Sequence, residues 1–169
     1  PRIGLMMTLA GDLEQFEWYG RGPHESYPDR EAGAAIGRHR GTVSEQYVPY
    51  PFPQECGNKE DVRWAALTDD VGEGVLFSMD TPLAFSALRY TPGDLNRAGH
   101  TYDLKPRRNI TVCVDYRQCG LGNASCGPPV LDKYALYADT IEFGFAMRPC
   151  YAASGDLAEM ARLRLPDIE

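Results

Sequence analysis

The sequence lacks a long apolar run, and its basic residues are outnumbered by acidic ones. No stretch approaches the ~20 apolar residues that a membrane-spanning helix requires. Lysine and arginine total 17 against 24 aspartate and glutamate residues, so the formal net charge is −7. An acidic surface repels the phosphate backbone of a polyanion. We therefore expect neither a membrane nor a nucleic acid as a partner.

Cysteine is also scarce, and its spacing excludes two common kinds of site. The five cysteines form an odd set with no Cys-x-x-Cys pair, which suits neither a disulfide framework nor a tetrahedral zinc site. Residues 1–10 are too short and interrupted for a secretory signal. We expect a reducing, cytoplasmic setting for thiols at Cys56, Cys113, Cys119, Cys126 and Cys150.

Familiar catalytic motifs are missing. The sequence contains no Gly-x-Ser-x-Gly elbow, no phosphate-binding glycine loop and no His-Glu-x-x-His helix. A metal triad of His24, His39 and His100 in space stays open as the weaker alternative. The acidic residues favour solvated or turn-capping carboxylates over a catalytic pair; they include Glu25, Asp29, Glu55, Glu60, Asp61, Asp69 and Asp70.

The dominant periodicity is two residues, which is typical of strands. With 169 residues, the chain fits one domain that can bury a core. Short β-branched or aromatic runs bounded by turn residues predict an all-β, antiparallel fold with a hairpin turn at 68–74. The predicted strands are 3–9, 13–19, 62–67, 74–78, 85–90, 109–115 and 140–147.

Helical signals are few. Residues 91–98 fit either one short helical turn or an ordinary loop, with Asp94 suited to a helix amino end. Residues 156–165 carry an Asp followed three residues later by Glu159, which is a capping-box pattern. We expect a short terminal helix there, outside the β-core.

Two segments, 17–30 and 46–64, interleave aromatic residues, prolines and glycines at high density. Together with 85–90 and 120–128, these segments resemble the carboxy-terminal domain of the large bacterial β-galactosidases of glycoside hydrolase family two. The resemblance covers residues 1–149. Residues 150–169 lie outside it and are expected to form a C-terminal extension with a short helix.

The resemblance implies an antiparallel β-sandwich of the supersandwich, galactose mutarotase-like kind. The family's domain begins well upstream, so this chain corresponds to the later part of that domain. A partial sheet leaves strand edges unpaired, and such edges pair readily with another chain. We therefore expect a homo-oligomer.

The resemblance also implies where the chemistry of the parent enzyme lies. The family's catalytic glutamates and its magnesium and sodium ligands belong to a separate barrel, and no segment here matches their motifs. The resemblance therefore assigns this chain no catalytic residue, no metal ligand and no cofactor. Its expected partners are the barrel and a galactoside such as lactose, and the chain by itself is expected to be inactive.

One loop of the family's domain reaches over the barrel mouth to the leaving-group subsite. By resemblance, this subsite loop is Gly120–Pro128, and its substrate-binding candidates are Asn123, Ser125 and Cys126. Cys126 stands where many members have tryptophan, in a loop one residue shorter. The cysteine removes a flat apolar face on which a sugar ring stacks, so we expect weaker or different leaving-group recognition.

Two alternatives stay open: a stand-alone carbohydrate-binding module, and a purely architectural or assembly domain. We expect the aromatic residues of the two segments to pack against the rest of the enzyme, and His100 to be a hydrogen-bonded structural group. Sugar contact is the alternative, for which the candidate hydrogen-bonding side chains are His24, Glu25, Arg30 and Gln54.

Overall fold

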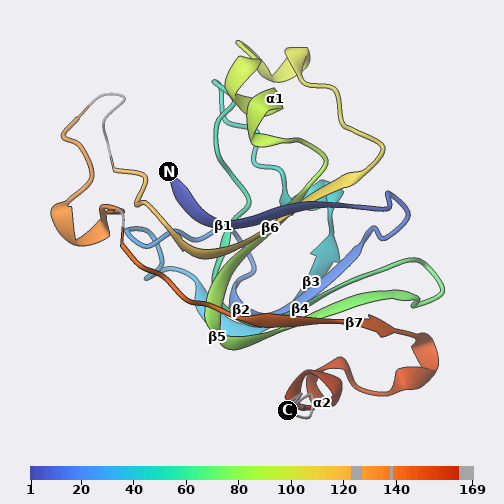
Figure 1. The fold of residues 1–169 in the computed structure, drawn as a ribbon. Helices are drawn as coiled ribbons and strands as arrows, with labels where there is room; N and C mark the ends of the chain where they lie inside the picture. The colour runs from blue at the N-terminus through green and yellow to red at the C-terminus, as the bar shows by residue number, and fades with distance from the viewer. Residues whose placement is uncertain (123–126, 138, 164–169) are drawn as a thin grey trace.

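The computed structural model describes residues 1–122, 127–137 and 139–163. In these residues it shows seven strands, two short α-helices and four single-turn 3-10 helices (Figure 1). The all-β, antiparallel prediction is confirmed, and the arrangement is sandwich-like and part of a domain. The strands are β1 Arg2–Leu9, β2 Gln15–Gly22, β3 Ala35–Thr42, β4 Lys59–Thr68, β5 Gly74–Leu88, β6 Ile110–Gln118 and β7 Phe145–Cys150. The helices are α1 Pro92–Arg97 and α2 Leu157–Arg162.

The strands form one sheet in the order β1-β6-β5-β4-β2-β3, and β7 also pairs with β5. The 15-residue β5 replaces two predicted strands, 74–78 and 85–90. Its first half pairs with β7 and its last residues pair with β6, and Pro82 lies between the two ladders. Because proline lacks an N–H donor, it is tolerated where one ladder has ended and the next has not begun.

Two other strands differ from the sequence prediction, one in its existence and one in its start. Strand β3 was not predicted, because its sequence AIGRHRGT lacks apolar alternation. Among the described strands it pairs with β2 alone, in a register that places His39 opposite Trp18. Strand β7 begins at Phe145, five residues after the start of the predicted run. The hairpin at 68–74 is confirmed, since Thr68 pairs with Gly74 across the turn.

The main core lies on one face of the sheet and draws on β2, β4, β5 and β6. The rings of Phe16 and Trp18 stack with centroids 4.6 Å apart, and Phe85 lies 5.6 Å from Phe16. Val62 and Ala65 both enter this core although an odd separation should place them on opposite faces. A register shift between Val62 and Trp64 explains this, because a bulge changes which face the following side chains meet.

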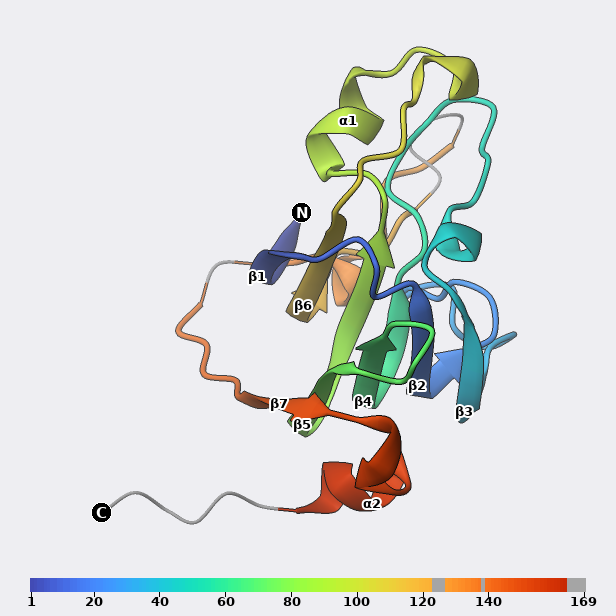
Figure 2. The same cartoon turned by 90° about the vertical axis from the view of Figure 1, so that its right-hand side faces the viewer.

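Helix α2 covers part of the opposite face (Figure 2). Its partly buried residues pack against Trp64, Leu76 and Cys150. The Asp156 carboxylate caps the helix by accepting a bond from the Ala158 N–H at 2.7 Å. The prediction of a short terminal helix outside the main core is therefore confirmed.

Helix α1 settles the open choice at residues 91–98 in favour of a helical turn. The Thr91 hydroxyl accepts from the Asp94 N–H, and the Asp94 carboxylate accepts from the Thr91 N–H. This reciprocal pair is a capping box. Among the described residues, no helix is both long and apolar enough to cross a membrane.

Candidate functional site

The subsite loop is described only at its two ends. The predicted substrate-binding residues Asn123, Ser125 and Cys126 lie outside the described residues. What the structure places is Gly120–Gly122 on one side and 127–130 on the other. We call Gly120–Gly122 and Val130 the loop neck.

Three successive N–H groups of the loop neck donate to acceptors outside it. The Gly120 N–H donates to the Tyr134 carbonyl at 2.9 Å. The Leu121 and Gly122 N–H groups donate to the two oxygens of the Asp29 carboxylate, at 3.0 Å and 2.7 Å. Successive N–H groups commonly form such binding sites for anionic oxygens.

Both glycines of the neck are required by close packing. A Cβ at Gly120 would lie 2.7 Å from Val130 Cγ2 and 2.8 Å from the Asp29 carboxylate. Gly122 has a φ of +60°, and a Cβ there would lie 2.7 Å from the Val130 nitrogen. Side chains with a Cβ rarely adopt this backbone conformation. The two ends of the loop are therefore pressed together at the neck.

Asp29 belongs to a tight turn over residues 27–30. The Arg30 N–H donates to the Tyr27 carbonyl at 2.8 Å, with Pro28 fixing the backbone between them. Tyr27 is fully buried, and Asp29 is half-buried at the tip. The turn thus has a buried base and a carboxylate aimed at the loop neck.

Glu25 ties this turn to the second aromatic segment. Its side chain is buried and accepts hydrogen bonds from Arg30, from the Tyr50 hydroxyl and from the Gly57 N–H, the last at 2.8 Å. Charge-assisted bonds of this kind are stronger than neutral ones. Internal partners occupy the Glu25 carboxylate, which favours the expected packing role over the alternative of sugar contact at this residue.

Asn58 lies at the centre of a second buried set of polar groups. Its amide donates to the Ser26 carbonyl at 3.0 Å and to Glu60 at 2.7 Å. Gln118 donates to the Asn58 oxygen at 2.9 Å and to Asp115 at 3.2 Å. Burial raises the pKa of Glu60 to about 7 and that of Asp115 to about 6, because it disfavours the charged form.

These contacts correct the expectation of solvated or turn-capping carboxylates. It fails for Glu25, for Glu60 and for Glu55, which pairs with Arg2 at 2.6 Å and whose pKa is raised by burial. It holds for Asp69, whose carboxylate accepts N–H groups within the hairpin turn. Some partners are close in sequence, such as Asn58 for Glu60 and Arg30 for Glu25, but Gly57 of Glu25 and Arg2 of Glu55 lie 32 or more residues away, where no local pattern indicates them.

Lys59 is a further buried charge beside these networks. Its ammonium donates to the Pro23 carbonyl at 3.1 Å and lies 5.0 Å from the Trp18 ring centroid. Burial lowers its pKa to about 8. A cation over an aromatic face is favourable, which offsets part of the cost of burying the charge.

The aromatic residues of the two segments divide into two groups. Trp18 and Tyr27 are buried within this chain, which corrects the expectation that they pack against the rest of an enzyme. Phe52 and Tyr19 are 64% and 37% exposed, so their rings are accessible. His24 and Gln54 are exposed as well. His100 stacks on Tyr102, and its backbone N–H donates to Asp103 at 2.9 Å.

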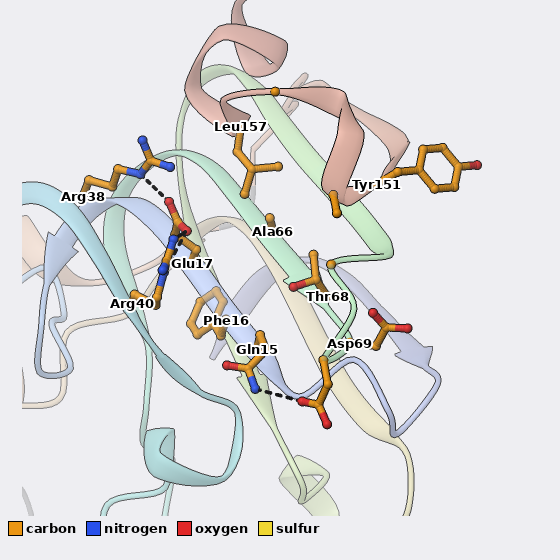
Figure 3. A pocket seen from close by; sticks show the side chains of 14 residues that line it. Gln15, Phe16, Glu17, Arg38, Arg40, Ala66, Thr68, Asp69, Tyr151 and Leu157 are labelled. Carbon is orange, nitrogen blue, oxygen red and sulfur yellow. Dashed lines mark hydrogen bonds and ion pairs between the residues drawn. The ribbon is translucent and has the colours of Figure 1, made fainter.

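A separate hollow of about 330 Å³ lies between β2, β3 and the α2 segment (Figure 3). Within it, Arg38 and Arg40 both bind the Glu17 carboxylate, and Gln15 donates to Asp70 at 3.3 Å. Of the candidate residues that the structure describes, none of His24, Glu25, Arg30 and Gln54 lines this hollow. Its two arginines are thus paired with Glu17, while Asp69 and Asp70 accept from backbone N–H groups and from the Gln15 amide.

No metal site emerges from the described part of the chain. No group of three or more His, Cys, Asp or Glu side chains there could hold an ion. The cysteines that the structure describes, at 56, 113, 119 and 150, are free thiols.

The residue that sequence reasoning missed is Asp29. The signal available was its place directly after Pro28, since the pair Pro-Asp is typical of turns. The loop it binds lies 92 and 93 residues further along the chain. No local pattern could connect the two.

Comparison with known proteins agrees with this architecture. The family described as "Beta galactosidase small chain" matches residues 1–147. A beta-galactosidase of Priestia megaterium is 44% identical over 140 residues, covering 82% of this chain and 14% of the relative. Those of Arthrobacter sp. and Kluyveromyces lactis are 35% and 34% identical, covering 80% and 86% of this chain and 14% of each relative. The chain belongs to the beta-galactosidase small chain family.

Proposed function

We propose that this chain is the C-terminal domain portion of an enzyme that hydrolyses terminal, non-reducing β-D-galactosides. The observation that carries the proposal is the family match over residues 1–147, together with relatives named beta-galactosidase. The chain spans about 14% of the length of these relatives. Its partner is therefore the remainder of the enzyme, including the catalytic barrel, with the magnesium and sodium sites assigned to that barrel.

Within that enzyme, the domain supports the barrel and supplies the subsite loop to the leaving group. Asn123, Ser125 and Cys126 are the proposed contacts with the substrate. The loop neck supports this role, because three consecutive N–H groups and two close-packed glycines fix how the loop leaves the sheet. The exposed Phe52 and Tyr19 rings are suited to packing against the barrel.

The chemistry of hydrolysis belongs to the barrel. The carboxylates of Glu25, Glu60 and Asp115 are engaged in hydrogen bonds within this domain. The cavity beside Glu55 holds only about 10 Å³, which is far too small for a sugar ring. The chain purified alone, free of host hydrolase, is therefore expected to cleave no nitrophenyl galactoside; cleavage by it would overturn this assignment.

The leaving-group role is tested by Cys126→Trp in the full-length enzyme. An indole at this position offers a flat apolar face to a sugar or aryl ring. We expect tighter binding of lactose and of aryl galactosides, measured as KM and as inhibition by the non-hydrolysed thio-analogues. Unchanged KM and inhibition constants for both substrates would contradict a role of the loop in binding the leaving group.

We also propose that the domain contributes to a homo-oligomer. In the described part of the chain, β1 pairs only with β6 and β3 only with β2, so each strand leaves one edge free. Free edges present unpaired N–H and C=O groups to other chains. Light scattering that shows a monomer at high concentration, for both the chain and the full enzyme, would count against this.

A stand-alone carbohydrate-binding module is the alternative, favoured by exposed rings such as Tyr102, which is 79% exposed and stacks on His100. Calorimetric titration of the isolated chain with galactose and lactose decides it. Millimolar or tighter binding would support the module. Absence of sugar binding by the isolated chain, together with activity of the full-length enzyme, would support the proposal that the chain is part of a β-galactosidase.

A further inference from the structure

The contact between Asp29 and the loop neck joins segments 92 and 93 residues apart in the sequence. Each oxygen of one carboxylate accepts one N–H: Oδ1 from Leu121 and Oδ2 from Gly122. A two-point contact fixes orientation as well as distance, since both N–H vectors must point at the same carboxylate.

The contact is rigid on the Asp29 side. The turn at 27–30 has a fully buried Tyr27 at its base, and the Ser26 N–H before it donates to the Asn58 carbonyl at 2.8 Å. Arg30, at the end of the turn, binds the buried Glu25 carboxylate. Asp29 is therefore held by the domain core rather than by the loop.

The loop side has few other attachments. Among its described residues, Asp29 is the only side chain that hydrogen-bonds the loop backbone between Gly120 and Val130. The backbone of the neck adds one bond, from Gly120 to Tyr134. The direction in which the loop leaves the sheet thus depends heavily on one carboxylate.

We propose that Asp29 is a positioning residue for leaving-group recognition. It sets the orientation of the subsite loop without touching the substrate, and this inference rests on the proposed function. Under the proposed function the loop contacts the leaving group, which is a whole glucose unit in lactose. In methyl β-D-galactoside it is a single methoxy group, which offers almost nothing for the loop to contact. Loss of the Asp29 contact should therefore affect lactose selectively.

Asp29→Asn is the sharpest variant because it is isosteric. The amide keeps one acceptor oxygen but places an NH₂ donor against the second N–H donor of the neck. Asp70→Asn is the matched control: the same substitution, in an exposed residue of the hairpin between β4 and β5 whose carboxylate accepts from Gln15. Gly120→Ala provides a second route, since its methyl group would lie 2.8 Å from the Asp29 carboxylate.

The experiment measures kcat/KM for lactose and for methyl β-D-galactoside in the full-length enzyme. In Asp29→Asn we expect the lactose value to fall about fivefold, mostly through KM, as the loss of one charged hydrogen bond at a distance allows. The methyl galactoside value should stay within twofold. Gly120→Ala should shift the ratio in the same direction, and Asp70→Asn should not shift it.

Hydrogen–deuterium exchange of the peptide spanning the neck checks the physical link in the same enzyme. The Asp29→Asn protein should exchange faster there, and the Asp70→Asn protein should match the wild type. An unchanged substrate ratio in Asp29→Asn, with an active wild type, would overturn the inference alone. A wild type inactive on both substrates would overturn the proposed function and this inference with it.

Discussion

Glu25 and Asp29 are two carboxylates of one short segment, yet they do different work. Glu25 is 5% exposed and receives its hydrogen bonds from Arg30, Tyr50 and Gly57. Asp29 is half-buried, and both of its carboxylate oxygens accept hydrogen bonds from the backbone of a distant loop. The first holds two segments of the domain together, and the second holds the loop in place.

The difference shows how a structural carboxylate is distinguished from a positioning one. A buried carboxylate bonded to side chains and backbone of its own domain contributes to stability, and its loss lowers the free energy of unfolding. A carboxylate bonded to the base of an otherwise lightly held loop contributes to the direction of that loop. The predictions below separate these two effects.

The largest effect is expected from Glu25→Gln. The amide removes the charge that binds Arg30 and turns an NH₂ group toward one of the three donors. We expect a loss of about 3 kcal/mol in the free energy of unfolding, because three hydrogen bonds to one buried charged group are lost or weakened. Urea denaturation of the isolated chain measures it, with Asp70→Asn as control. A loss below about 1 kcal/mol would contradict the structural role.

Next in size is a pH dependence that originates at Glu60. Its pKa is raised from 4.5 to about 7, so between these values the folded chain binds more protons than the unfolded chain. Stability should therefore fall as the pH rises from 4.5 to 7. The loss is on the order of 2 kcal/mol after allowance for partial exposure to solvent.

Glu60→Gln should flatten this slope while keeping an oxygen for the Asn58 amide. The pKa of Asp115 is raised only to about 6, so most of its contribution to the slope lies below pH 6. The interval from pH 6 to 7 therefore reports mainly on Glu60. Denaturation midpoints at these pH values compare the two proteins. A Glu60→Gln protein with the wild-type slope would show that another group titrates.

A smaller loss is expected from Gly122→Ala at the loop neck. The φ of +60° and the close Val130 nitrogen strain any residue with a Cβ, which should cost about 1.5 kcal/mol. Gly33→Ala is the matched control, since its Cβ would meet only His24, at 3.9 Å. Equal unfolding free energies for the two variants would mean that the neck is not packed as described.

The smallest effect is expected from Thr91→Ala, at a residue that hydrogen-bonds neither of the two carboxylates nor any of their partners. The variant removes the hydroxyl that caps α1 and should cost about 1 kcal/mol. Thr91→Ser keeps the hydroxyl and should retain most of the stability. The Thr91→Ala enzyme should keep the wild-type selectivity between galactosides. It therefore shows what a loss of stability does when the loop is not displaced.

The sequence predicted the parts of this molecule that rest on local patterns. Alternating apolar residues located most of the strands, and acidic residues and glycines located the hairpin at 68–74, whereas the early proline and Asp94 only offered α1 as one of two choices. The resemblance supplied the family. These features depend on neighbours within a few residues.

Features that depend on distant partners could not be predicted. Strand β3 has no apolar alternation and exists because β2 offers it an edge. The bonds of Glu25 to Gly57 and of Asp29 to Gly122 span 32 and 93 residues. Such contacts follow from the assembled sheet, and no spacing in the sequence marks them.

The most direct test compares Asp29→Asn with Glu25→Gln in the full-length enzyme, at a temperature where both are folded. The quantity is the ratio of kcat/KM for lactose to kcat/KM for methyl β-D-galactoside. We predict a roughly fivefold fall in this ratio for Asp29→Asn and a clearly smaller fall for Glu25→Gln, because Glu25 reaches the loop only through Arg30 and the turn, although Glu25→Gln loses more stability. The same ratio in both variants would contradict the division between a carboxylate that holds the domain and one that directs its loop.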